Sequence, residues 1–82
     1  MTMNEARRVL HQMFWSRLDQ KDRIDVLVSA GLMPQPIVSR LPHTIERMFL
    51  ESANDRENLS RLWAEVTRRM PEELRKPNPF EA

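Results

Sequence analysis

The chain has 82 residues, of which 40% are hydrophobic and 30% charged, and this is the composition of a small folded domain with one core. Its 13 basic and 12 acidic side chains leave a formal net charge of +1, so no overall field draws it to a phosphate backbone or an anionic membrane. The lack of cysteine excludes disulfides and thiolate metal sites, and no long apolar run predicts a membrane span or a signal peptide. We therefore expect a cytoplasmic domain that binds neither nucleic acid nor a membrane.

The residue content favours an all-α fold of about five short helices. The chain has one glycine and is rich in leucine, methionine, arginine and glutamate, which suit helices, and it shows no alternation typical of strands. Asn4 is the predicted N-cap of a first helix that runs to about Leu18. Residues recur along this helix at three- and four-residue spacing, and we expect them to form one apolar stripe: Ala6, Leu10, Met13, Phe14, Arg17 and Leu18.

A second helix is predicted to begin after Asp19, a good N-cap residue, with the negative charge of Asp22 in its first turn. Gly31 followed by Leu32 is typical of a helix end in the left-handed conformation, so this helix is expected to end there. Its inward-facing residues are predicted to be Ile24, Leu27 and Val28.

Prolines divide the middle of the chain. Pro36 suits the first turn of a short third helix, and Pro42 is predicted to close that helix after little more than one turn. A fourth helix is expected to begin at His43 or Thr44. Its buried side is predicted to consist of Ile45, Met48, Phe49 and Ala53.

The fifth helix has the strongest periodic pattern and follows a predicted capping pair of Asn54 and Glu57. Pro71 is expected to stop it or to begin a short extra turn. We therefore predict a helical domain over residues 1–74 and a flexible tail or linker over residues 75–82. One contiguous core is predicted to join the first, second, fourth and fifth helices through Leu10, Phe14, Leu27, Phe49, Leu62, Trp63 and Val66.

The residues supply no recognisable catalytic apparatus. A hydrolase or transferase needs a nucleophile, a base and an electrophile stabiliser, but the chain has two histidines and neither cysteine, tyrosine nor a glycine-rich loop. His11 and His43 lack the spacing of a metal site, so a surface or capping role is expected for each. Glutamates interrupt the basic run around Arg68, which favours a solvated helix end over a nucleic-acid patch. We predict that the protein is not an enzyme and holds no cofactor.

The order of these landmarks resembles that of the bacterial effector-associated domains, small helical modules likened to the death-domain superfamily. The resemblance is carried by Val9–Phe14, Leu18–Asp19 with Asp22, Ala30–Leu32, Ile37, Ile45–Ala53, and Leu59–Val66 with Pro71. It implies a death-fold-like bundle that pairs with a similar helical domain and joins an effector to a sensor in a prokaryotic conflict or defence system. Self-association is a further implication.

Two other functions stay open from the residues alone. Short, closely linked helices are compatible with a DNA-associated regulator of the helix-turn-helix type, although prolines stand where a compact turn is expected. A small inhibitor of a toxin or phage system has the same composition as an adaptor. A measurement of binding to duplex DNA distinguishes the two: a DNA-associated regulator should bind and lose affinity as the salt concentration rises, whereas an adaptor should not bind.

One predicted contact with the protein partner is aromatic. On a helical wheel Trp15 falls outside the buried stripe, beside Arg8 and His11, and tryptophan and arginine are typical interface anchors. The alternative is that the tail or the third helix covers Trp15. Together with the charged residues of the second and fifth helices, the predicted partner-binding set is Arg8, Trp15, Asp22, Asp25, Val26, Arg61 and Arg68.

The other predicted contact is electrostatic. The second helix is expected to present Asp22 and Asp25 around an exposed Val26, and the fifth helix presents arginines on its outer side. A head-to-tail contact between an acidic and a basic face would build an open assembly. The competing interpretation is that both faces are merely solvated, with Glu65 bound to the two arginines of its own helix.

Overall fold

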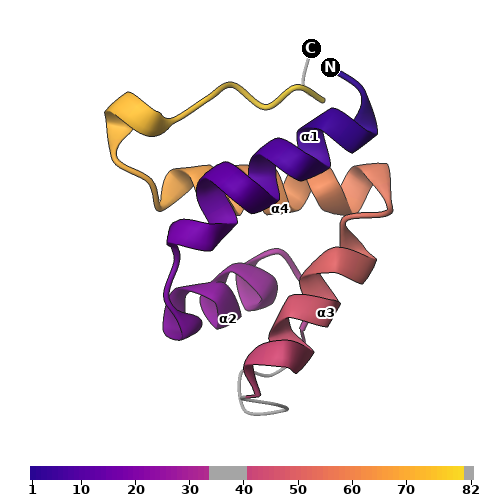
Figure 1. Cartoon of the computed structure of the whole chain (residues 1–82), viewed down its shortest axis with the longest axis vertical. Helices are drawn as coiled ribbons and strands as arrows, with labels where there is room; N and C mark the ends of the chain where they lie inside the picture. Colours follow the sequence, from indigo (N-terminus) through magenta and orange to yellow (C-terminus); the bar gives the residue numbers. More distant parts are fainter. Residues whose placement is uncertain (34–40, 81–82) are drawn as a thin grey trace.

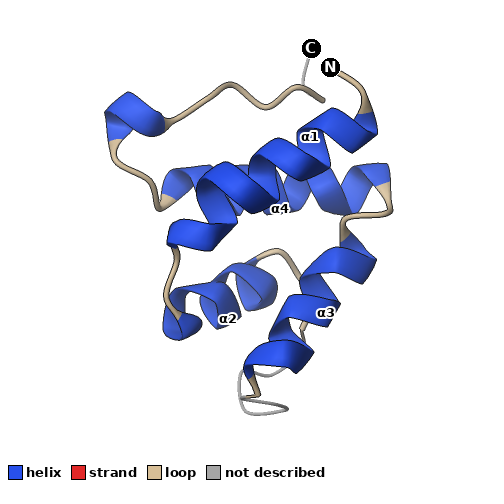
Figure 2. Cartoon of the chain, viewed as in Figure 1, coloured by secondary structure: helices blue, strands red, loops and turns tan. Residues whose placement is uncertain are grey.

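The computed structural model describes residues 1–33 and 41–80, and four α-helices and no strand lie in this part of the chain (Figure 2). The helices are α1 (Met3–Val9), α2 (Gln20–Ser29), α3 (Pro42–Ser52) and α4 (Arg56–Arg68). α2 packs against both α3 and α4, and the segment that follows α1 packs against α4 (Figure 1). None of the described helices combines the length and the apolar character needed to span a membrane. The all-helical prediction is confirmed for the described residues, with four α-helices there in place of about five.

Pro42 begins a helix. The predicted third helix falls chiefly on residues 36–40, which lie outside the described residues, so the end expected for it at Pro42 stays a prediction. The next helix, α3, was expected to begin at His43 or Thr44 and begins slightly earlier, with Pro42 in its first turn. A proline is tolerated there because the N–H groups of a first turn have no partner within the helix.

Both ends of α2 follow the prediction. Asp19 Oδ1 accepts a hydrogen bond from the Asp22 backbone N–H at 2.8 Å, so Asp19 caps the helix. Gly31 follows the helix with a φ of 75°, in the left-handed region that favours glycine. These two residues fix where α2 begins and ends.

The caps of α1 and α4 differ from the prediction. Thr2, and not Asn4, caps α1, because its side chain accepts from the Glu5 N–H at 3.1 Å and the Glu5 carboxylate accepts from Thr2 in return. Asp55, and not Asn54, caps α4 by accepting from the N–H three residues later at 3.0 Å. Thr2 is the better cap of α1 because it forms a complete capping box with Glu5. Asp55 is the better cap of α4 because the positive end of a helix favours a carboxylate over an amide.

A π-helical segment (Leu10–Phe14) and a 3₁₀ turn (Trp15–Arg17) continue α1 and change which side faces the core. The wider π turn inserts one residue, so the side chains after it are rotated by about 100° from their place on an α-helical wheel. Trp15, which follows this turn, has no accessible surface, and Met13 within it, predicted to be buried, is 44% exposed. The predictions of a buried Met13 and an exposed Trp15 are therefore wrong, and the alternative that the chain itself covers Trp15 holds.

The predicted core is confirmed. All seven predicted residues are buried and belong to one contiguous cluster. Within it Phe14 and Trp63 meet edge to face, with ring centroids 5.9 Å apart and planes at 75°. Other large, fully buried side chains that this predicted core did not include are Trp15, Val26, Met33, Ile45 and Leu59.

α2 buries Ile24 and Leu27 as predicted, but the edges of its buried side differ from the prediction. Val26 is completely buried, whereas Val28, which was expected to face inward, is only partly buried. Because α2 contacts α3 and α4 at once, its buried arc is wider than that of a helix with one neighbour. The predicted exposure of Val26 is therefore wrong.

After α4, a 3₁₀ turn (Glu72–Leu74) leads into residues 75–80, drawn in yellow in Figure 1. This part of the predicted tail contacts α4, because Lys76 and Asn78 form hydrogen bonds with Trp63 and Ser60. The predicted domain boundary at residue 74 stays a prediction.

Candidate functional site

The structure divides the seven residues predicted to bind a partner. Trp15 and Val26 are completely buried and cannot contribute to a surface of the folded monomer. The five others are exposed or half-buried: Arg8 on α1, Asp22 and Asp25 on α2, and Arg61 and Arg68 on α4. Four of these five belong to two helices that pack against each other.

A shallow hollow of about 360 Å³ lies where α2 ends beside α4, and we call it the α2–α4 hollow. Small residues keep it open. A Cβ at Gly31 would meet no atom within 4 Å, and Ala64 on α4 is exposed. The residues that line the α2–α4 hollow are Ser29, Ala30, Gly31, Arg61, Ala64 and Glu65.

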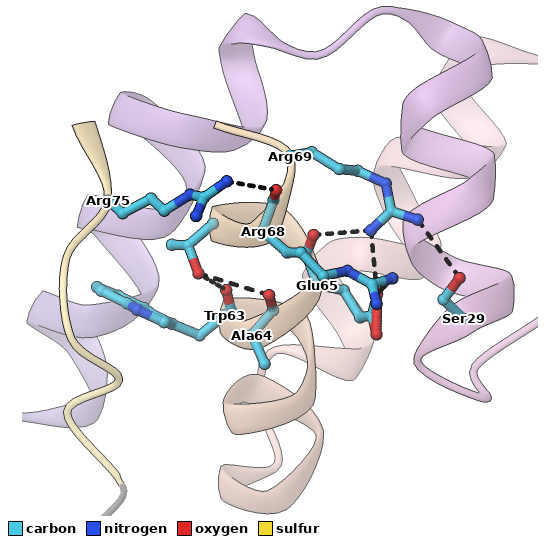
Figure 3. Close-up of polar contacts among 8 residues, drawn as sticks. Ser29, Trp63, Ala64, Glu65, Arg68, Arg69 and Arg75 are labelled. Carbon is cyan, nitrogen blue, oxygen red and sulfur yellow. Dashed lines mark hydrogen bonds and ion pairs between the residues drawn. The ribbon is translucent and has the colours of Figure 1, made fainter. Parts of the chain in front are cut away.

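The side of the α2–α4 hollow formed by the end of α4 is held by an ion pair (Figure 3). Arg69 Nη1 donates to the Glu65 carboxylate at 3.0 Å and to the Glu65 carbonyl at 2.8 Å, and Arg69 Nη2 donates to Ser29 Oγ at 3.4 Å. The Arg69 and Glu65 side chains are only 20% and 19% exposed. The ion pair and the hydrogen bond to Ser29 therefore link the end of α2 to the end of α4.

The two outer arginines of α4 are more exposed and pair within their own helix. Arg61 Nη2 lies 2.9 Å from Glu57 Oε1, and Arg68 Nη2 lies 2.6 Å from Glu65 Oε2. The pairing of Glu65 with Arg68 was expected from the interpretation that both helix faces are solvated. Arg61 was expected to pair with Glu65 as well, but pairs with Glu57. Exposed pairs of this kind contribute little to stability, so both arginines can exchange these contacts for those of a partner.

A second polar cluster lies between the π-helical segment, α2 and α3. The Trp15 indole N–H donates to Glu46 Oε2 at 2.8 Å, and His11 Nε2 donates to the other oxygen of the same carboxylate. The Arg23 guanidinium lies 5.3 Å from the centre of the Trp15 ring, and Phe49 stacks on that ring with centroids 4.1 Å apart. Trp15 is thus covered by α2 and α3, and Glu46 satisfies its polar group.

Glu46 is the charged centre of this cluster. Burial raises the pKa of its carboxyl, but the hydrogen bonds from His11 and Trp15 and the charges of His11 and Arg23 outweigh burial, so the pKa lies below its ordinary value. The carboxylate is therefore ionised at neutral pH. Its three partners come from the π-helical segment, the 3₁₀ turn after it and α2, and nothing in the local sequence around Glu46 predicts the cluster.

Among the described residues, no three histidine or acidic side chains lie close enough together to share a metal ion. The exposed features of this part of the chain include a shallow hollow and charged helix faces on a four-helix scaffold. The described residues form a small four-helix scaffold whose polar groups lie mostly on its surface.

A family model described as the GTPase-associated adaptor domain matches residues 6–68, from within α1 to the end of α4. The chain therefore belongs to the GTPase-associated adaptor domain family. No curated protein and no solved structure matches the chain at a significant level. The match supports the adaptor type of domain that the sequence resemblance implied, whereas the death-fold-like arrangement stays a prediction.

Proposed function

We propose that this adaptor domain joins an effector to a sensor in a prokaryotic conflict or defence system, with a GTPase on one side of the connection. The family match over residues 6–68 carries this proposal, because it covers the described helical bundle almost entirely and names an association with GTPases. The partner is a second helical adaptor domain, and a death-fold-like arrangement of both domains is part of the proposal. The domain itself contributes binding and no chemistry.

The α2–α4 hollow is the proposed contact surface. Asp22 and Asp25 precede Ser29 by about two turns and one turn, so all three lie on one side of α2. Ser29 in turn forms a hydrogen bond with Arg69 at the end of α4. The acidic side chains of α2 and the outer arginines of α4 therefore border the same face.

This placement favours a closed pair over the open assembly expected from the sequence. When opposite charges share one face, two copies related by a two-fold axis can each place their acidic side chains against the other's arginines. Opposite faces would instead be needed for head-to-tail growth. The α2–α4 hollow, with Gly31 and Ala64 exposed, gives room for close approach of the two backbones.

Charge reversal tests this surface. One variant carries Asp22→Arg with Asp25→Arg, and a second carries Arg61→Glu with Arg68→Glu. Each alone should lose at least about tenfold in affinity, for itself and for the adaptor domain of a GTPase from the same genome. A mixture of the two variants should bind again, because the contact face of the first variant is entirely basic and that of the second is entirely acidic.

Sedimentation velocity at low salt measures both affinity and the size of the complex, and melting temperatures show that each variant is folded. Arg47→Glu is the matched control, since Arg47 is an exposed arginine of α3 paired with Glu51 at 4.0 Å. Equal binding by all variants would refute the proposed surface. Salt-sensitive binding of duplex DNA would instead favour the DNA-associated regulator.

A further inference from the structure

Residues 75–80 form an extended segment that we call the C-terminal strap. It follows the 3₁₀ turn and runs beside α4, outside the residues that the adaptor family model matches (Figure 1). Its first residue, Arg75, is anchored to the end of α4. Arg75 Nε donates to the Met70 carbonyl at 3.0 Å, and Nη2 donates to the Arg68 carbonyl at 3.3 Å, the second contact being drawn in Figure 3. The strap thus packs on the helical bundle from outside the matched part of the chain.

Two polar contacts hold the middle of the strap. The Trp63 indole N–H donates to the Lys76 carbonyl at 3.1 Å. Asn78 Nδ2 donates to the Ser60 carbonyl at 3.2 Å and to Ser60 Oγ at 3.0 Å. The first contact needs only a main-chain carbonyl and the second only an amide donor, so another extended segment can supply both.

An aromatic side chain ends the strap. Phe80 is half-buried against the core cluster, with the Arg56 guanidinium 5.3 Å from its ring centre. A hollow of about 460 Å³ lies beside it, lined by Asp55, Arg56, Glu57, Ser60 and Phe80 itself. Phe80 therefore leaves room that a larger aromatic group could fill.

The conformation of the strap suits a ligand. Pro77 and Pro79 restrict φ, and the Phe80 N–H donates to Asn78 Oδ1 at 2.9 Å, which closes a local turn. A segment that is already ordered in its bound shape loses little conformational entropy on binding. No helix or strand pairing of the described residues holds it in place.

We infer that the side of α4 formed by Arg56, Ser60 and Trp63 is a peptide-binding site, which the C-terminal strap occupies in cis. The partner that it fits is an extended, proline-containing segment with an amide side chain and a following aromatic residue. By helical spacing this site lies on a different side of α4 from Arg61, Ala64 and Arg68. It is therefore a second binding surface, independent of the α2–α4 hollow.

Release of the strap in the full chain tests this site. Asn78→Ala with Phe80→Ala removes two anchors, and the Trp63 indole N–H resonance should shift as its hydrogen bond to Lys76 is lost. A synthetic peptide of residues 75–80 should return this resonance to its original position. The peptide should bind the released variant at least tenfold more tightly than it binds the wild-type chain. A peptide with alanine in place of phenylalanine is the control and should bind at least tenfold more weakly.

A second experiment uses the wild-type chain and so does not depend on the folding of the variant. A spin-labelled peptide in large excess should displace the strap and broaden the resonances of Ser60 and Trp63. Absence of this broadening at millimolar peptide would overturn the inference. A folded variant whose Trp63 resonance has shifted but which does not bind the peptide would also overturn the inference. The same holds for a folded variant whose Trp63 resonance stays at the wild-type position.

Discussion

The two tryptophans of the chain are both buried but satisfy their indole N–H groups in different ways. Trp63 lies on α4 among apolar side chains, and its N–H donates to a main-chain carbonyl of the C-terminal strap. Trp15 lies beyond α1, between α2 and α3, and its N–H donates to the ionised carboxylate of Glu46. Burial of one indole depends on neutral groups and burial of the other on charge.

This difference separates two kinds of stabilisation within one small core. Around Trp63 the free energy of unfolding comes chiefly from apolar area and close packing, which respond weakly to pH and salt. Around Trp15 a carboxylate, an imidazole and a guanidinium share a partly buried site, so removal of one partner leaves polar groups without compensation. Three predictions test this division.

The largest effect is expected for Trp63→Ala. Removal of a fully buried tryptophan costs about 3–5 kcal/mol, which is much of the total stability of a domain of this size. Urea unfolding followed by circular dichroism should show a chain that is unfolded or nearly so. Met13→Ala is the control, because Met13 is exposed and its removal should change stability by less than about 0.5 kcal/mol. A Trp63→Ala chain that melts within a few degrees of the parent would remove Trp63 from the centre of the core.

The contrast between the tryptophans also marks the reach of sequence-based prediction. Trp63 belongs to a helix whose apolar residues recur with a strict helical period, so its burial follows from local pattern alone. Asp19 and Gly31 are likewise local signals, and both mark the ends of α2 as predicted. The all-helical fold and most of the core follow from residues of this kind.

The position of Trp15 could not be predicted in this way. The wheel assumes an unbroken α-helix, but the π-helical segment rotates the residues after it, and Trp15 then contacts Glu46 and Phe49 of α3. Glu46 and Phe49 stand more than 30 residues away in the sequence. Pattern within one helix contains no information about such partners.

The candidate site shows the same limit. The charges of Arg61 and Arg68 on the outer side of α4 were predicted from helical spacing. The α2–α4 hollow was not predicted, because it exists only where the end of α2 lies beside the second half of α4. Gly31 and Ala64 carry no functional group, so they have significance only once both helices are in place.

A smaller loss is expected when the carboxylate beside Trp15 is removed. Glu46→Ala leaves the buried Trp15 N–H without an acceptor, at a cost of about 1–3 kcal/mol. For a chain of this length that lowers the melting temperature by about 4–8 °C for each kcal/mol. Glu46→Gln is the matched control, because its amide oxygen can still accept from Trp15, and it should lose less. Equal melting temperatures for the alanine variant and the parent would show that Glu46 does not support Trp15.

The smallest effect, and the sharpest test of the contrast, is a pH dependence confined to the Trp15 side. The folded-state pKa of Glu46 lies below the ordinary value of 4.5, so the unfolded chain takes up this proton first as the pH falls. The stabilisation from the ionised carboxylate is therefore fully present above about pH 4.5 and is lost as the pH falls through the lower folded-state pKa. Urea unfolding between about pH 5.5 and 3 should show the difference in stability between the parent and Glu46→Gln shrinking towards the acid end.

The difference in stability between the parent and Asn78→Ala is the control and should stay constant over the same pH range, because neither Asn78 nor its partner Ser60 ionises. A pH-independent difference for Glu46→Gln would show that His11 and Arg23 do not hold this carboxylate in its charged form, and the two tryptophans would then be buried in the same way.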